Sequence, residues 1–190
     1  HGGSGAGKST LCKQFLKALR ERDERPLVLS GRCYEHEDVP FKVLDGVVDS
    51  LSWLLRHCPR EETEALLPRD VVFLSRLFPV LLQVPAIKAS PQRRIADDLQ
   101  VRQAAFAALR ELMISLAQHR PLVLYVDDLQ WGDEDGISLL LEVLRPPPPP
   151  LLLIVSYRSE EGASSAALQL LRKGLRGELG QGVALREVPV

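Results

Sequence analysis

The first ten residues, HGGSGAGKST, constrain the fold more than any other stretch of the chain. They contain the spacing Gly-x4-Gly-Lys-Ser, which runs from Gly2 to Ser9. Glycines at positions 2, 3, 5 and 7 permit backbone angles that are closed to other residues, and they let the main chain approach a ligand without a Cβ clash. The loop amides can then converge on an anion, and a helix beginning near Lys8 adds its positive N-terminal end. The pattern therefore predicts a phosphate-binding P-loop between a buried strand and a helix.

Each position of this loop has an expected contact with a nucleoside triphosphate. Lys8 would bridge the β- and γ-phosphates, the Ser9 hydroxyl would complete the shell of a Mg²⁺ ion, and Thr10 would lie near the α-phosphate. The residues predicted to bind the nucleotide are Gly2, Gly3, Ser4, Gly5, Ala6, Gly7, Lys8, Ser9 and Thr10.

Strand-like and helix-like stretches alternate along the chain. Apolar runs predict strands at 26–33, 121–128, 151–158 and 184–190. The two middle runs are nearly continuous in Leu, Val and Ile, which is typical of strands buried on both faces of a parallel sheet. Stripes at helical spacing lie between the runs, and two of them consist of Cys12, Phe15, Leu16 and Leu19, and of Leu44, Val47, Val48, Leu51 and Leu55. We therefore expect an α/β fold in which helices flank a parallel sheet.

The segment 59–92 departs from this alternation. Its prolines are Pro59, Pro68, Pro79, Pro85 and Pro91. Proline removes a backbone donor and disfavours helical geometry in the preceding residue, so short, interrupted helices are expected, with a longer helix after the last proline. We interpret this segment as a helical insertion in a single domain that covers residues 1–190, a length that suits one domain.

A second motif, LVLYVDDLQWGDED, occupies residues 122–135. Its apolar run places Asp127 at the carboxyl end of a buried strand, where open α/β sheets bind ligands. This is the Walker B position, and Asp127 would hold the Mg²⁺ ion together with Ser9. Asp128 would orient or deprotonate the attacking water. Asp133 is the expected N-cap of the following helix.

The third apolar run leads into SYRSEE at residues 156–161. If this strand lies beside the Walker B strand, the Arg158 guanidinium would face the γ-phosphate and report whether that phosphate is present. The alternative is a solvated arginine at a strand end. Arg158 joins Lys8 and Asp128 as the predicted catalytic residues.

Charge and composition narrow the classes of function. The chain has 24 basic and 25 acidic residues and a net charge of −1, so no overall attraction to nucleic acid or to an anionic membrane is expected. The three cysteines form no CxxC pair, which indicates neither a disulfide framework nor a zinc site. No apolar run approaches the roughly 20 residues that span a bilayer. We expect a soluble, cytoplasmic protein.

Several stretches, in this order, resemble a known family. GGSGAGKSTL, GRCYEHEDVPFKVLDGVVDSL, LSRLFPVLLQVPAI, LYVDDLQWGDEDGISLL and LLLIVSYRSEE are similar to the AAA-type ATPase module of bacterial STAND regulators, also described as an origin-recognition-like AAA ATPase domain. Such modules occur in large bacterial serine/threonine protein kinases, adenylate cyclases and LuxR-type regulators. The resemblance implies a P-loop NTPase fold (ASCE/AAA-like) with sheet order 5-1-4-3-2. On that order the apolar runs are strands 2 to 5, and the central first strand is expected to precede residue 1.

The resemblance also implies a function. In this family, ATP binding and slow Mg-ATP hydrolysis act as a conformational switch that signals to attached kinase, helical-repeat or output domains and permits a nucleotide-dependent oligomer. Asp128 stands where many AAA+ enzymes have glutamate, which suits slow hydrolysis. ATP and Mg²⁺ are the implied cofactors, and the choice of ATP over GTP rests on the resemblance alone. Protein kinase activity would lie outside these residues, because no HRD, DFG or kinase-type glycine loop is present.

Two other functions are alternatives. One is a DNA-associated AAA+ ATPase of the origin-recognition type, although the balanced charge makes nucleic acid an unexpected partner. The other is a small-molecule kinase, which would need an arginine-rich lid; the sequence offers QRR at 92–94 for that role.

Overall fold

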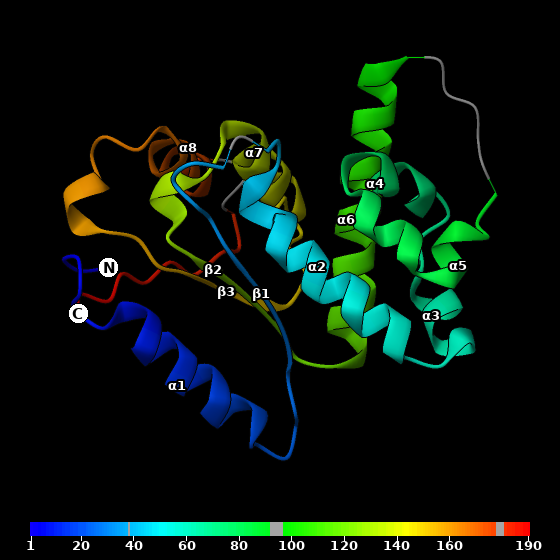
Figure 1. Ribbon diagram of the computed structural model, residues 1–190, viewed down its shortest axis with the longest axis horizontal. Coiled ribbons are helices and arrows are strands. Elements are labelled where there is room, and N and C mark those ends of the chain that lie inside the picture. Colours follow the sequence, from blue (N-terminus) through cyan, green and yellow to red (C-terminus); the bar gives the residue numbers. More distant parts are fainter. Residues whose placement is uncertain (38, 92–96, 178–180) are drawn as a thin grey trace.

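The computed structural model describes residues 1–37, 39–91, 97–177 and 181–190. Its helices and strands are α1 (Lys8–Arg20), β1 (Leu27–Arg32), α2 (Lys42–His57), α3 (Arg60–Leu66), α4 (Val71–Leu77), η1 (Pro79–Gln83), α5 (Pro85–Lys88), α6 (Asp98–His119), β2 (Leu122–Asp127), η2 (Leu129–Trp131), α7 (Glu134–Val143), β3 (Leu151–Val155), η3 (Ser159–Glu161) and α8 (Ala166–Arg176). Within the described residues the strands form one three-stranded sheet with helices on both faces (Figure 1). The expected α/β fold is confirmed.

The strands lie in the order β1-β2-β3, and both neighbouring pairs are parallel. The expected sheet order 5-1-4-3-2 also places strands 2, 3 and 4 side by side, and β1, β2 and β3 correspond to these three strands. At the end of β3, Gly2 forms a parallel bridge with Arg158, so the start of the glycine loop lies beside the chain that leaves β3. Parallel strands present their carboxyl ends at one edge of the sheet, and the glycine loop lies at that edge.

The run 184–190 does not form a strand, contrary to the sequence-based expectation. Near its end, the Val190 amide donates to the His1 carbonyl at 2.8 Å, and the N-terminal amine of His1 donates to the Val188 carbonyl at 2.8 Å. The two termini therefore lie side by side (Figure 1). Leu185 and Val188 are exposed, so these apolar residues do not form a buried face. Alternation of apolar residues specifies a strand only where one face of that strand is buried.

One face of the sheet carries the main core, together with α2, α6 and α7. The predicted apolar stripe of α2 is buried along its length, and Val47, Val48 and Leu51 are fully enclosed. The helix approaches β1 closely at Gly46, where a Cβ would come within 2.8 Å of the Gly31 Cα. Glycine is therefore required at this crossing for steric reasons.

Asp133 ties two helices together on this face. As expected, it is the N-cap of α7 and accepts a hydrogen bond from the Gly136 amide at 2.9 Å. The same carboxylate accepts hydrogen bonds from the Phe41 amide at 2.8 Å and the Val43 amide at 3.3 Å, at the start of α2. One side chain therefore satisfies amides at the N-termini of both helices.

The opposite face of the sheet is covered by α1 (Figure 1). Its small core consists of Leu16, Val123 and Tyr125. Phe15, which the sequence pattern placed in the apolar stripe of this helix, is 44% exposed. The stripe lies on a helix as expected, but the small core under α1 includes Leu16 and not Phe15.

The proline-rich segment contains α3, α4, η1 and α5. Proline is the N-cap of α3 at Pro59 and the first residue of η1 and α5 at Pro79 and Pro85. These are positions where the missing amide costs no helical hydrogen bond. Residue 92 of this segment, and the QRR at 92–94 considered above as a lid, lie outside the described residues.

Candidate functional site

The glycine loop has the backbone that close approach to an anion requires. Gly5 and Gly7 have φ of 77° and 86°. Apart from the adjoining residues of the chain, no described atom lies within 4 Å of the place where a Cβ would sit on either glycine. The residues from Ser4 to Gly7 are exposed, as is Thr10. Among the described residues, no side chain caps α1 and no acidic residue occupies its first turn. Its first amides therefore have no side-chain acceptor, which suits an anion at this helix end.

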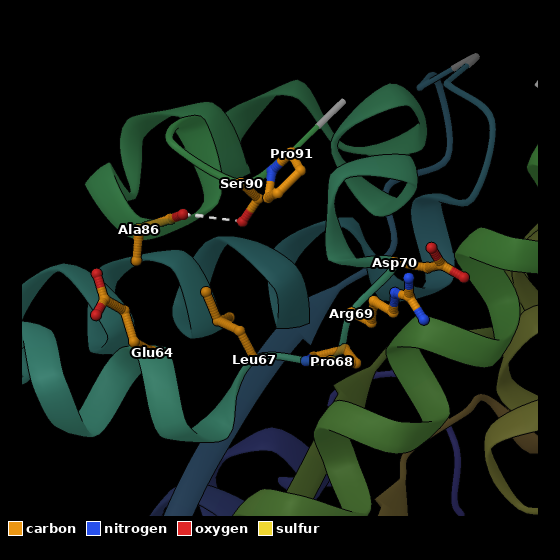
Figure 2. Close-up of a pocket in the computed structure, with 8 residues that line it drawn as sticks. All are labelled: Glu64, Leu67, Pro68, Arg69, Asp70, Ala86, Ser90 and Pro91. Carbon is orange, nitrogen blue, oxygen red and sulfur yellow. Dashed lines mark hydrogen bonds between the residues drawn. The ribbon is translucent and has the colours of Figure 1, made fainter. Parts of the chain in front are cut away.

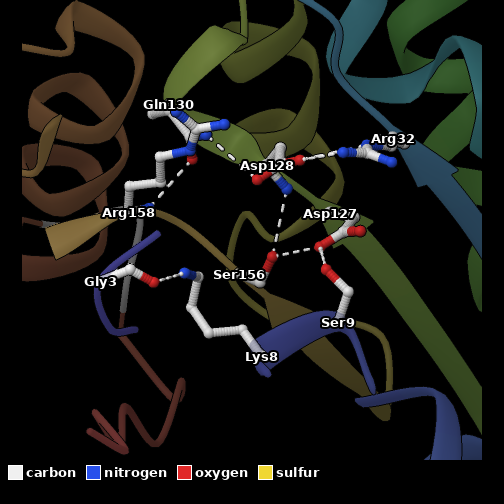
Figure 3. Close-up of polar contacts among 9 residues, drawn as sticks. All are labelled: Gly3, Lys8, Ser9, Arg32, Asp127, Asp128, Gln130, Ser156 and Arg158. Carbon is white, nitrogen blue, oxygen red and sulfur yellow. Dashed lines mark hydrogen bonds and ion pairs between the residues drawn. The ribbon is translucent and has the colours of Figure 1, made fainter. Parts of the chain in front are cut away.

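Lys8 is folded back onto the loop. Its Nζ donates to the Gly2 carbonyl at 2.8 Å. It also donates to the Gly3 carbonyl at 2.7 Å (Figure 3). The residue is only 7% exposed, and a buried ammonium group is tolerated only when it is hydrogen-bonded. The loop thus holds a positive charge against its own carbonyls, where an anion seated in the loop would meet it.

Ser9 and Asp127, predicted as metal ligands, lie in direct contact. The Ser9 hydroxyl donates to Asp127 Oδ1 at 3.0 Å, which joins the start of α1 to the end of β2. Ser156 donates a second, short hydrogen bond to the same oxygen. Burial favours the protonated form of Asp127, but the hydrogen bonds, led by that from Ser156, outweigh it and lower the pKa of this carboxyl. An ionised carboxylate beside a hydroxyl is the kind of oxygen donor set that Mg²⁺ prefers.

Each polar group of Asp128 has a hydrogen-bond partner in the protein. Its backbone is in the left-handed region, with φ 54° and ψ 44°, which Asp tolerates better than most residues. Oδ2 accepts from Arg32 Nη2 at 2.7 Å and Nε at 3.1 Å, and Oδ1 accepts from Gln130 Nε2 at 3.1 Å. The amide donates to Ser156 Oγ at 3.1 Å. A carboxylate has about four acceptor sites, so a water could still be bound.

Arg158 lies beside the glycine loop, but its head group is stacked elsewhere. β3 is next to β2, as the prediction for this arginine required. The Arg158 guanidinium lies over the Trp131 ring, 5.8 Å from its centroid. Its amide donates to Gln130 Oε1 at 3.1 Å. The backbone of Arg158 therefore pairs with Gly2 of the glycine loop, while its guanidinium stacks on the indole of Trp131.

Three residues that contact the two aspartates were not predicted from the sequence as site residues. They are Arg32, Gln130 and Ser156, and Figure 3 shows them around Asp127 and Asp128. Arg32 is the last residue of β1 and Ser156 follows β3 directly. A survey of polar residues at the carboxyl end of every expected strand would have found both, because those ends share one edge of a parallel sheet.

A separate hollow of about 390 Å³ lies among α3, α4 and α5 (Figure 2). Its lining includes the apolar residues Leu67, Pro68 and Ala86 and the charged residues Glu64 and Arg69. No predicted site residue lines it. It is at the opposite end of the molecule from the glycine loop (Figure 1).

The chain matches a known family of domains. The family model described as AAA ATPase domain matches residues 1–155, a range that includes the glycine loop, both aspartates and β3. No curated protein and no solved structure matches significantly. In the part of the chain that is described, no helix combines the length and apolar character needed to cross a membrane. With most of its length matched, the chain belongs to the family of AAA ATPase domains, and its general function is that of an ATP-binding ATPase domain.

Proposed function

We propose that the chain is the nucleotide switch of a bacterial signalling protein of the STAND class, fused to a serine/threonine protein kinase, with residues 1–190 forming one ATPase domain and 59–92 a helical insertion. It would bind Mg-ATP, hydrolyse it slowly and pass its state to attached domains. The observation that carries the proposal is the 3.0 Å contact between Ser9 and Asp127. This contact joins two motifs distant in sequence at one edge of the sheet, next to a loop that offers amides and a lysine to an anion.

The residues present fit a magnesium-bound triphosphate. Residues 2–10 would surround the phosphates, and Lys8 would exchange the Gly2 and Gly3 carbonyls for phosphate oxygens. Ser9 and Asp127 would hold the metal ion. Bound Mg²⁺ would supply charge neutralisation at the phosphoryl group.

Hydrolysis would depend on Asp128 and Arg158. Asp128 would accept a proton from the attacking water, and Arg158 would leave Trp131 to read the terminal phosphate. Slow turnover is expected because the side chain of Asp128 is shorter than that of the glutamate that many AAA+ enzymes have at this position. A balanced net charge of −1 favours this regulatory role over a DNA-associated one; salt-dependent DNA binding by the intact protein would reverse that preference.

The first test is Lys8→Ala in the intact protein, with ATP affinity measured by calorimetry. We expect at least a ~100-fold loss, because the buried cation would meet the phosphates directly. Lys13→Ala is the control, since Lys13 is an exposed lysine on the same helix. Equal affinity of the wild type and Lys8→Ala would remove the proposed phosphate site.

The second test separates the two aspartates. Asp127→Ala should remove the gain in ATP affinity that Mg²⁺ provides. Asp128→Asn should leave affinity within about threefold and slow hydrolysis by ~100-fold or more, in the range expected when a proton-transfer group is lost. Unchanged turnover in Asp128→Asn would assign the base to another residue.

A further inference from the structure

Gln130 occupies a position between two residues of the proposed site. It belongs to the turn η2 and is only 6% exposed. Its Nε2 donates to Asp128 Oδ1 at 3.1 Å, and its Oε1 accepts from the Arg158 amide at 3.1 Å. A carboxylate only accepts and a backbone amide only donates, so this one orientation of the carboxamide satisfies both neighbours.

The backbone around Gln130 is fixed as well. The Gln130 carbonyl accepts from Ser165 Oγ at 3.0 Å. The amide of Leu129, before it, donates to the Ser156 carbonyl at 2.8 Å, and the amide of Trp131, after it, donates to the Asp128 carbonyl at 3.1 Å. The carboxamide therefore projects from a turn that is held at three points, and the location of its two polar atoms is set by the fold.

The two holders of the Asp128 carboxylate differ in kind. Arg32 holds Oδ2 with a charged side chain that is 52% exposed, and such a contact is weakened by water and salt. Gln130 holds Oδ1 with a neutral, buried donor. A buried neutral donor can fix the direction of a carboxylate without placing a full charge beside it.

The other end of the carboxamide is anchored to the chain that touches the glycine loop. Arg158 forms the parallel bridge with Gly2, and the Ser159 amide donates to the Gly2 carbonyl at 3.1 Å. A continuous path of hydrogen bonds therefore runs from the loop through the Arg158 segment and Gln130 to Asp128.

We propose that Gln130 is a positioning residue that sets the orientation of the Asp128 carboxylate relative to the glycine loop. This inference rests on the proposed function, because it assumes that Asp128 acts on the attacking water. Gln130 itself does not contact the nucleotide; it acts through Asp128. Small errors in the direction of a proton acceptor reduce rates strongly while leaving binding intact.

The test is Gln130→Met in the intact protein, which keeps the length of the side chain and removes both polar atoms. Single-turnover hydrolysis of ATP with Mg²⁺ should fall ~10- to 100-fold, while the ATP dissociation constant stays within about threefold. In the Asp128→Asn background, the same substitution should slow hydrolysis by less than about twofold. A merely structural role would give similar losses in both backgrounds, and that result would overturn the proposal.

Gln130→Glu provides a second variant for the case in which the methionine variant fails to fold. It keeps the acceptor for the Arg158 amide and replaces only the donor to Asp128. Turnover should fall at least as far as expected for methionine, and wild-type turnover would overturn the proposal.

Thr63→Val is the matched control. It removes a similarly buried hydrogen bond, from Thr63 Oγ1 to the Leu55 carbonyl at 3.1 Å, in the helical segment. It should hydrolyse ATP like the wild type. Absence of ATP binding by the wild type would instead reject the proposed function, and full turnover in Asp128→Asn alone would assign the base to another residue, so these failures are distinguishable from a failure of the Gln130 proposal alone.

Discussion

The hydrophobic cores on the two faces of the sheet differ in size. Under α2, α6 and α7, side chains such as Leu124 and Val126 lie in a continuous core that extends into the helices beyond. Under α1, a small cluster around Leu16 covers the sheet, and Leu11 and Phe15 on the same helix are 48% and 44% exposed.

This difference bears on the site, because its parts come from both faces. Lys8 and Ser9 are in the first turn of α1, on the thinly covered face. The holders of Asp128 include Gln130, whose turn packs against the deep core through Leu129. Lys8 and Ser9 are therefore on the less firmly anchored element, whereas Gln130, which contacts Asp128, is in a turn packed against the deep core. Local stability differs between such regions of a protein.

The sharpest test of the comparison is a matched pair of leucine truncations. Leu124→Ala should lower the free energy of unfolding by about 4 kcal/mol, and Leu16→Ala by about 2 kcal/mol, because a cavity in a deep core relaxes less than one under a single helix. Leu124 is 1% exposed and Leu16 5%, so burial alone does not separate them. Denaturant unfolding of the intact protein measures both. Equal losses would break the comparison.

Substitution of Asp133 tests whether polar contacts on the face with the larger core also stabilise the protein. Asp133→Ala should lower the free energy of unfolding by about 2–3 kcal/mol, because three amides at two helix N-termini lose their acceptor. The control is Asp97→Ala, which removes a simple cap that accepts from the Leu99 amide, with an expected loss of about 1 kcal/mol. Similar losses for the two variants would show that the link between α7 and α2 contributes little.

Hydrogen exchange compares the faces without mutation. Amides in the middle of α1 should exchange about 10-fold faster or more than those in the middle of α2, because of the residues of α1 only Lys8 and Leu16 are buried. Nuclear magnetic resonance or mass spectrometry of the nucleotide-free protein measures the ratio. Equal protection of the two helices would contradict this prediction.

The smallest expected effect is on acid stability, at the edge that both faces share. Since the pKa of Asp127 is lowered from 3.8 in the folded protein, its contribution to stability is present above that ordinary value and is lost as the pH falls through the folded-state value. The stability difference between the wild type and Asp127→Asn should therefore shrink between about pH 5 and 2. Thermal denaturation across this range measures it, and a constant difference would indicate that hydrogen bonding does not lower this pKa.

The local features of the fold could be predicted because each is specified by neighbouring residues. The glycine spacing from Gly2 to Gly7 permits the left-handed backbone at the loop, and the continuous apolar run before Asp127 marks β2 as a buried strand. Asp133 was identified as a cap from its place before an apolar helical stripe. The run 184–190 was misjudged because alternation gives a strand only when a partner and a buried face are present.

The sequence by itself determined the glycine loop, the parallel α/β fold and the placement of Asp127 and Asp128 at a strand end, since these follow from spacing and from periodicity within single segments. The tertiary structure decided which strand ends meet. It brought Arg32 and Gln130 onto the two oxygens of Asp128, placed Ser156 between the aspartates and left Phe15 exposed. Those contacts join residues from separate elements, and their geometry depends on the order of the strands and the depth of packing on each face, neither of which is encoded in any one stretch of sequence.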